Sequence, residues 1–293
     1  MRPIIALVFL SSFASAQDTD SLFNRLQGMT HFGYDFFNVD GMDISFVPQR
    51  GEFTPKAIAR IYRQDKIKAS EITAADDKLD KPNYYVSKTE PRGEGLVGYM
   101  DYWFIKHGDS IQMVSFRALH KVDQALARQI VLLCVNGGMP ASIYQPTDPD
   151  KINFAGREIN RGQSCRWMGP NNLQCPYNGQ MNWSSYKTLD DANFALETHF
   201  KFLDANAKGK IISDQLVDAV FEEQDVKARK MVFDLTGVTS ILAGMSGGKT
   251  LTVYMVAAQV RGKSVSCVIS HWNNDRLNEN GLPALGAEVL TLK

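Results

Sequence analysis

The feature that most constrains the fold is a pair of strand-forming runs joined by a tight turn and followed by a helix. Residues 99–106 and 110–116 are rich in aromatic and β-branched side chains, and the turn-forming residues 107–109 lie between them. Apolar residues then recur at helical spacing across residues 122–133. A hairpin needs further strands and a covering layer to bury its apolar face, so this stretch predicts an antiparallel sheet with a helix packed on it.

The same order of elements recurs near the end of the chain. Strand-forming runs over residues 251–260 and 264–272 flank a turn at 261–263, and a short helix is predicted over residues 282–290. The sequence therefore predicts the α+β class, with two antiparallel-sheet modules that each carry a hairpin followed by a packed helix. Duplication of one module and chance recurrence of a common motif both remain open, because residue identity between the halves is poor. The arrangement resembles that of the PsbP-like α+β proteins, and no function is inferred from it.

Composition divides the chain into four parts. Residues 1–16 are predicted to be a signal peptide, residues 17–145 an N-terminal α+β module, residues 146–189 a disulfide-containing connection and residues 190–293 a C-terminal α+β module. Turn-forming residues concentrate in the connection, as is typical of linkers. Residues 64–94 are polar, and we expect them to form a solvated loop.

The N-terminal segment predicts export. An apolar run over residues 4–13 is followed by the small residues Ala14, Ser15 and Ala16, which is the layout of a cleavable secretory signal. No later run stays apolar for the roughly 20 residues that a membrane-spanning helix needs. We therefore expect a soluble protein that is secreted or periplasmic and has no membrane span.

Charge is balanced, with 32 basic and 32 acidic side chains, and 44% of the residues are hydrophobic. The hydrophobic fraction is typical of a globular protein with a sizeable core. A nucleic-acid partner would require a basic face, so no nucleic acid is expected to bind.

Four cysteines in an exported chain predict disulfide bonding. Cys165 and Cys175 flank a loop rich in glycine, proline and asparagine, and a bridge between them would contribute about 2–3 kcal/mol by restricting the unfolded chain. Cys134 and Cys267 lie in apolar patterns, one helical and one extended. They either pair across the core or remain buried thiols.

A glycine-rich stretch, residues 243–250, comes close to the phosphate-binding loop of nucleotide-binding proteins. That loop needs its lysine at the start of a helix, whose amides hold the phosphate. Here strand formers follow Lys249, and Ala243 replaces the first required glycine. We therefore interpret the glycines as a turn between two strands and expect no nucleotide cofactor.

Residues 204–215 resemble a calcium-binding EF-hand loop in spacing. Asp204, Asn206 and Gly209 occupy the first, third and sixth positions, but Lys208 stands at the fifth and Gln215 at the twelfth, where an oxygen ligand and a glutamate are expected. A lysine inside a calcium site is repulsive, so a helix ending in a turn that leads to two strands is the favoured interpretation. Calcium binding remains the alternative.

No catalytic or metal motif is present. The five histidines are scattered, and neither a zinc motif nor a nucleophile elbow occurs. Cys267 and His271 would lie about 13 Å apart on a strand, too far to share a hydrogen bond. Catalytic residues drawn from distant parts of the chain would leave no such signal.

The loop around the predicted disulfide has an unusual composition, with aromatic rings among amides. Aromatic faces stack on apolar surfaces of sugars or peptides, and amides bind their polar groups. The alternative is that these rings attach an irregular segment to the protein. The candidate ligand-binding residues are Trp167, Asn171, Tyr177, Trp183 and Tyr186.

These observations favour an exported, soluble, non-enzymatic protein that binds a small molecule, glycan or protein, or that is associated with the cell envelope. Binding is expected between the modules or at the aromatic loop. The alternative is a secreted hydrolase with dispersed catalytic residues. A hydrolase should place a titrating group with a perturbed pKa in a deep pocket, whereas a binding protein should expose its aromatic loop at an open rim.

Overall fold

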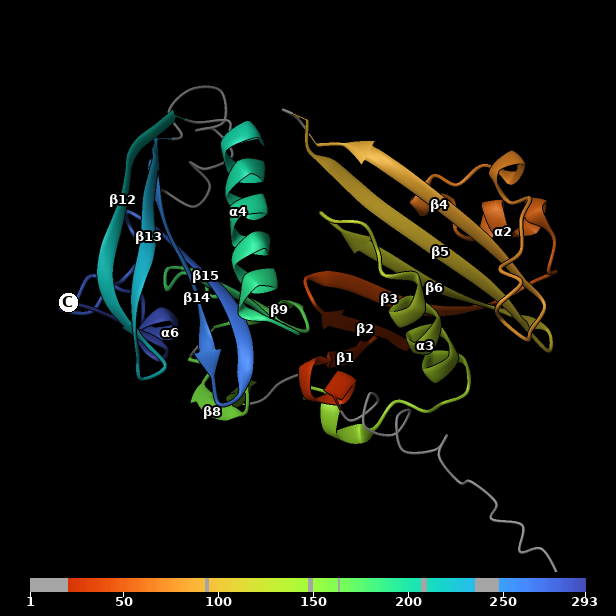
Figure 1. The fold of residues 1–293 in the computed structure, drawn as a ribbon, viewed down its shortest axis with the longest axis horizontal. Coiled ribbons are helices and arrows are strands. Elements are labelled where there is room, and N and C mark those ends of the chain that lie inside the picture. Colours follow the sequence, from red (N-terminus) through yellow and green to blue (C-terminus); the bar gives the residue numbers. More distant parts are fainter. Residues whose placement is uncertain (1–20, 93–94, 147–149, 163, 207–209, 235–247) are drawn as a thin grey trace, which may run out of the picture.

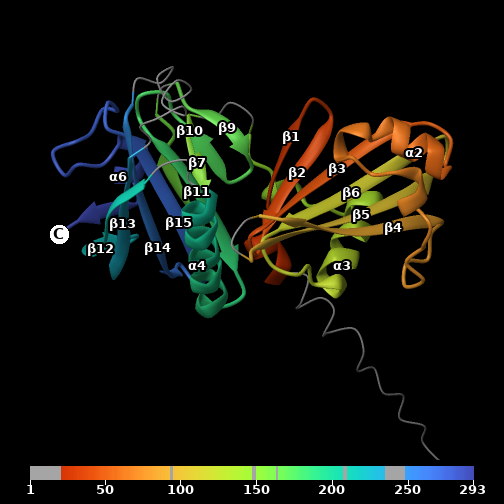
Figure 2. The same cartoon turned by 90° about the horizontal axis from the view of Figure 1, so that it is seen from above.

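The structure is a computed structural model that describes residues 21–293 apart from 93–94, 147–149, 163, 207–209 and 235–247. Within these residues the chain is mostly β, with two large antiparallel sheets arranged side by side and few helices (Figures 1 and 2). The predicted signal peptide lies outside the described residues. The prediction of an α+β fold with one helix packed behind each hairpin is wrong, because each sheet has many more strands than one hairpin supplies.

The first sheet has six strands in the order β1-β2-β3-β6-β5-β4. Strands β1 to β3 form one meander and β4 to β6 a second, and the two meanders join where β3 pairs with β6. The bounds are β1 (Gln27–His31), β2 (Tyr34–Val39), β3 (Met42–Arg50), β4 (Asn83–Pro91), β5 (Val97–His107) and β6 (Ser110–Ala118).

Helices cover both faces of this sheet because both faces are apolar. Alternate residues of β5 point to opposite sides. On one side the buried Trp103 belongs to the cluster packed under α3 (Gln124–Val135), and on the other Tyr102 belongs to the cluster under α2 (Pro55–Ile61). Short 3-10 helices complete this part of the chain: η1 (Arg63–Asp65), η2 (Ala69–Glu71) and η3 (Ala141–Ile143).

The described residues of the segment 64–94 do not form the solvated loop predicted from their polarity. They contain the whole of β4, and the buried carboxylate of Asp76 attaches the preceding segment to the sheet. Its Oδ2 atom accepts hydrogen bonds from Nε1 of Trp103 at 3.0 Å and from Nε of Arg128 at 2.7 Å. The segment is polar in composition, but the carboxylate of Asp76 is buried because its charge is paired.

The second sheet has eight strands in the order β16-β12-β13-β14-β15-β11-β10-β9 and is strongly curved (Figure 1). One face packs against α4 (Leu189–Asn206), and the hairpin β7-β8 and the one-turn helix α6 (Ala284–Ala287) cover the other. The bounds are β7 (Lys151–Phe154), β8 (Arg157–Asn160), β9 (Arg166–Gly169), β10 (Asn172–Gln174), β11 (Gln180–Tyr186), β12 (Lys210–Phe221), β13 (Gln224–Asp234), β14 (Thr250–Val260), β15 (Lys263–Trp272) and β16 (Leu290–Leu292).

A buried carboxylate holds the β7-β8 hairpin on this sheet. Glu222, at the turn between β12 and β13, accepts hydrogen bonds from Arg157 of β8 and from Arg261 at the β14-β15 turn. Arg261 also donates from Nη2 to the carbonyl oxygen of Phe154 at 2.7 Å. Two guanidinium groups therefore compensate one carboxylate whose side chain is 2% exposed.

The two sheets share one connectivity. Strands β1 to β3 are followed by α2 and by a second meander whose last strand, β6, pairs with β3. Strands β9 to β11 are followed by α4 and by a meander whose last strand, β15, pairs with β11, with β12 and β16 as additions. The hairpins predicted from sequence are β5-β6 and β14-β15, so both predicted hairpins are present at equivalent places.

Candidate functional site

The two sheets enclose a cleft of about 380 Å³ between them. Its floor is the part of the first sheet that α2 leaves uncovered, and its wall is formed by α4 together with β11 and β15. Figure 1 shows α4 on the side of the second sheet that faces the first.

The amino-acid sequence explains why α2 covers only half of its face of the first sheet. Along β6 the residues on this side change from the buried Ile111 and Met113 to the exposed Arg117, and along β3 they change from Val47 to Asp43. Asp43 and Arg117 are direct partners across the two strands. The apolar end packs under α2, and the polar end is left as the floor of the cleft.

Helix α4 packs on the second sheet with some of its side chains and lines the cleft with others. Thr188 caps it, because its Oγ1 atom accepts a hydrogen bond from the amide of Asp191 at 3.1 Å. Leu196 and Phe200, four residues apart, pack on the second sheet. Thr198 lies between them in sequence and lines the cleft.

Direct hydrogen bonds join the sheets beside the cleft. Oγ of Ser184, in β11, donates to Oδ1 of Asn38, in β2, at 2.7 Å. The amide of Asp40 donates to the carbonyl oxygen of Ser185 at 3.0 Å. Nδ2 of Asn171 in turn donates to Oγ of Ser184 at 3.0 Å, so the contact is part of a longer chain.

This series of hydrogen bonds ends on the carboxylate of Asp43. Nδ2 of Asn38 donates to Oδ1 of Asp43 at 2.9 Å, and each donor in the series Asn171, Ser184, Asn38 therefore points toward that acid. Solvent reaches Asp43 through the cleft, but protein surrounds it, and this burial raises its pKa above the ordinary value of 3.8. The hydrogen bond from Asn38 and the charge of Arg117 oppose the shift.

Arg117 does not neutralise Asp43 by direct contact. Its Nη2 atom donates to Oδ1 of Asp65 at 2.8 Å, and the Asp65 side chain is nearly buried. Burial raises the pKa of Asp65, and the charge of and hydrogen bond from Arg117 oppose that rise. The guanidinium group is therefore shared between Asp65 and the cleft.

Two histidines complete the polar lining. Burial lowers the pKa of His199, on α4, and of His120, after β6, although the charges of Asp40 and Asp191 act in the opposite direction on His120. Both imidazoles are therefore mainly neutral near pH 7 and can each donate and accept a hydrogen bond.

The structure disperses the five residues predicted to bind ligand. Trp183 is fully buried, and its ring packs near Phe154 in the core of the second sheet. Asn171 is also buried. Tyr186 lines the cleft, the half-buried Trp167 lines a separate cavity, and Tyr177, 58% exposed, lines a third. Their binding role therefore stays a prediction, but they do not form one surface.

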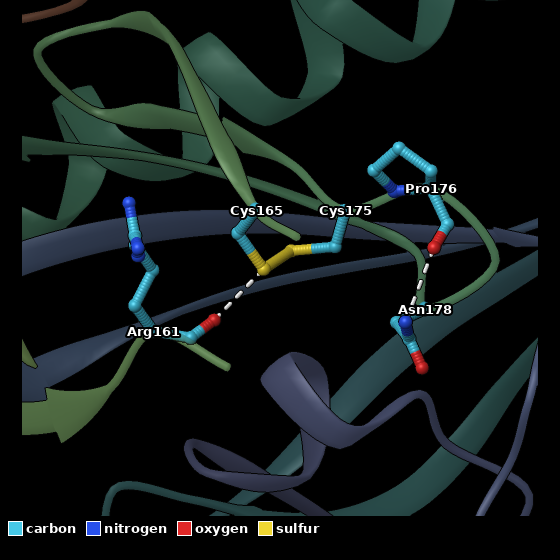
Figure 3. Close-up of a disulfide and its surroundings, with 5 residues drawn as sticks. All are labelled: Arg161, Cys165, Cys175, Pro176 and Asn178. Atoms are coloured by element: carbon cyan, nitrogen blue, oxygen red, sulfur yellow. Dashed lines mark hydrogen bonds between the residues drawn. A yellow bond between two sulfur atoms is a disulfide. The ribbon is translucent and has the colours of Figure 1, made fainter. Parts of the chain in front are cut away.

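The predicted disulfide between Cys165 and Cys175 is present and closes the β9-β10 hairpin (Figure 3). Sγ of Cys165 lies 2.8 Å from the carbonyl oxygen of Arg161, and Nδ2 of Asn178 donates to the carbonyl oxygen of Pro176 beyond the other end. Cys134 and Cys267 are separate buried thiols, which settles the alternative that the sequence left open.

The two loop motifs fall partly outside the described residues. Of the glycine-rich stretch, residues 243–247 are not described, but Thr250 begins β14, so a strand follows Lys249 as expected. Of the EF-hand-like loop, residues 207–209 are not described; Asp204 lies in α4 and Gln215 in β12. Across the described part of the chain, no three histidine, cysteine or acidic side chains are grouped as metal ligands, and no helix is long and apolar enough to cross a membrane.

Sequence reasoning missed Asn38, Asp43, Ser184 and His199. Asp43 carries no local signal, because it shares its face of β3 with Ser45, Val47 and Gln49, a pattern that does not single it out. The other three meet only through packing between the sheets.

Comparisons with known proteins give no family. No family model and no curated protein matches the chain. Among solved structures, DynU16, from the dynemicin biosynthetic locus, is 8% identical over 90% of this chain and 82% of that one, with a TM-score of 0.17. The di-domain ARO/CYC protein StfQ of the steffimycin pathway is 10% identical over 90% and 77% of the two chains, with the same TM-score. Similarity this low supports no argument about function.

Proposed function

We propose that this protein is an exported binding protein that holds a small hydrogen-bonding molecule in the cleft between its two sheets. The supporting observation is the convergence on this cleft of Asp43, His120 and His199, whose pKa values are all shifted. Convergent polar groups with perturbed pKa values beside apolar walls are the usual property of a ligand site.

The lining defines the class of ligand. Amides and hydroxyls of Asn182, Ser184, Tyr186 and Ser266 suit hydroxyl or peptide groups, and Phe202 adds an apolar surface on α4. A short glycan or a peptide presents both kinds of surface. The ligand therefore belongs to one of these two classes.

Export is part of the proposal. The signal-like residues 1–16 support it, and so does the disulfide, because such bonds persist in oxidising compartments. We infer a secreted or periplasmic location.

A cleft-filling variant tests the binding site. Ala195 lies on α4 and lines the cleft, so Ala195→Trp should block it; Lys201→Trp places the same ring on the exposed side of α4 as a matched control. Thermal shift against a panel of neutral oligosaccharides and short peptides should reveal a ligand that raises the Tm of the wild type and of Lys201→Trp but not of Ala195→Trp. Equal shifts in all three proteins would place the ligand elsewhere.

Hydrolysis is the second candidate, because the same acid and histidines could serve as general acid and base. Among the described residues, however, no histidine ring is hydrogen-bonded to a carboxylate or hydroxyl side chain; the one hydrogen bond of a histidine ring runs from His271 Nδ1 to the Trp272 carbonyl oxygen. An assembled base and nucleophile is the usual signature of such enzymes. Turnover of the bound ligand by the wild type, lost in Asp43→Asn, would establish the enzyme instead.

A further inference from the structure

A second cavity, of about 490 Å³, lies between the outermost strands of the two sheets. Strand β1 ends the first sheet, and β9 ends the second. Figure 2 shows these two strands next to each other at the junction of the sheets. The volume falls within the range of about 300–1,000 Å³ that is typical of small-molecule sites.

The walls of this cavity are apolar and adaptable. Met29 and Phe36, partners across β1 and β2, form one side, and Trp167 and Met168 of β9 form the other. Met168 is 63% exposed. Leaving apolar side chains open to water costs free energy, and flexible methionines can repack around apolar chains of different shape.

The ionisable residues around the cavity are all basic. His31, Arg161 and Arg166 line it, and no aspartate or glutamate does. Within the described part of the chain, Arg166 has no ion-pair or hydrogen-bond partner for its guanidinium group, and it is exposed. A cationic rim over an apolar cavity is complementary to a molecule with one anionic end and one apolar end.

The indole of Trp167 adds a polar requirement. Its Nε1 atom is buried and has no acceptor among the described residues. A buried donor without an acceptor costs free energy, and Nε1 of Trp183 in the core of the second sheet shares this property.

We propose that this cavity binds a free fatty acid, with the acyl chain between β1 and β9 and the carboxylate at Arg166. The site is independent of the cleft proposed above, because it is lined by a different set of residues. It gives the protein a second, lipid-binding activity that the polar cleft does not predict.

Calorimetric titration with monomeric dodecanoate tests this proposal. The wild type should bind one dodecanoate per chain, and dodecan-1-ol, which lacks the charge, should bind at least about tenfold more weakly. Arg166→Glu should weaken dodecanoate binding by at least the same factor. Arg50→Glu, which reverses a charge on a side chain that is 90% exposed, should leave it unchanged.

Two further variants separate this site from others. Ala195→Trp should keep dodecanoate binding, and Trp167→Phe should lose the change in tryptophan fluorescence that binding causes. Circular dichroism melting of every variant confirms folding. The proposal is overturned if dodecanoate does not bind below its micelle concentration, if Arg166→Glu binds it as the wild type does, if the alcohol binds equally well, or if Ala195→Trp abolishes binding.

Discussion

Ser184 and Asn38 lie 146 residues apart in the chain, and a hydrogen bond of 2.7 Å between them joins the two sheets. The Nδ2 atom of Asn38 in turn donates a hydrogen bond to Asp43, so the residues that join the sheets also position the acid of the cleft. Loss of the contact between the sheets should therefore change both stability and the chemistry of the cleft.

The first prediction concerns this contact. Ser184→Ala leaves the Oδ1 atom of Asn38 without its donor in a buried place, whereas the Nδ2 atom of Asn171 keeps the carbonyl oxygen of Trp183 as an acceptor. Buried groups that lose a partner cost about 1–3 kcal/mol, so urea denaturation should show a loss of that size. Thr73→Ala, at an exposed position, should change the free energy of unfolding by less than about 0.5 kcal/mol. Equal effects of the two substitutions would contradict the role of Ser184.

The free energy of unfolding should depend on pH in part through the titration of Asp43. Its pKa is raised in the folded protein, so the folded state holds this proton more tightly than the unfolded state does. The resulting stabilisation is fully present below the unfolded value near 3.8 and is lost as pH rises through the higher folded value. Asp43→Asn should therefore remove part of the decline in stability across that interval.

The histidines require a difference measurement. The pKa values of His120 and His199 are lowered in the folded protein, so their effect on the pH dependence of stability has the opposite sign to that of Asp43. As pH falls, these histidines become charged first in the unfolded state, and stability is lost. The quantity to compare is the free energy of unfolding of the wild type minus that of Asp43→Asn at each pH. Asp109→Asn, at an exposed position, is the control. A difference that does not change with pH would refute the raised pKa.

Asp76 is predicted to be a major determinant of stability in the first sheet. Burial raises its pKa, but hydrogen bonds from Arg128, Trp103 and the amide of Lys78 outweigh this and hold the pKa below its ordinary value. Its stabilising contribution is therefore present above the unfolded pKa and lost as pH falls through the lower folded one.

Replacing Asp76 tests this directly. Asp76→Ala leaves a partly buried guanidinium and a buried indole N–H unpaired, and we expect a loss of about 3 kcal/mol in equilibrium denaturation. Asp77→Ala, at the exposed neighbouring position, should have little effect. A loss below about 1 kcal/mol for Asp76→Ala would show that residues 64–94 are held by other contacts.

The cysteines give a prediction with a simple count. Cys134 and Cys267 are buried thiols whose pKa values are raised chiefly by burial, so they should not react with iodoacetamide in the folded protein. After denaturation without reductant the mass should show two alkylations, and after reduction four. Alkylation at Cys165 or Cys175 without reductant would contradict the bridge.

Local patterns predicted the elements that depend on local chemistry. The hairpin β14-β15 follows from alternating strand formers around Gly262, and α4 is the helix that was expected to end in a turn leading to two strands. The disulfide followed from Cys165 and Cys175 at the ends of a loop rich in turn formers.

The errors arose where tertiary contacts override composition. Strands β9 and β10 are short, and the turn formers around them indicate a loop. However, β10 pairs with β11 and β9 pairs with β10, which makes both strands part of the second sheet. Polar residues such as Asp76 and Asn83 led to the prediction of a solvated loop over residues 64–94. Both are buried, and the side-chain amide of Asn83 is hydrogen-bonded to the backbone N–H and carbonyl groups of Asp76. Hydropathy cannot distinguish a paired buried charge from an exposed one.

The candidate site was the least predictable part. Its residues come from β2, β3, β6, β11 and α4, and only the packing of two sheets brings them together. Some of the aromatic residues that suggested binding lie in the core instead, as the fully buried Trp183 does.

Native mass spectrometry of the protein, purified through an oxidising secretion route, tests the central claim most directly. We predict that the wild type and Lys201→Trp carry an adduct that is lost on denaturation, that Ala195→Trp lacks it, and that Arg166→Glu retains it because the adduct occupies the cleft. Retention in Ala195→Trp of an adduct whose mass is not that of a fatty acid, or an adduct-free wild type that also binds no member of the glycan and peptide panel, would contradict binding in the cleft.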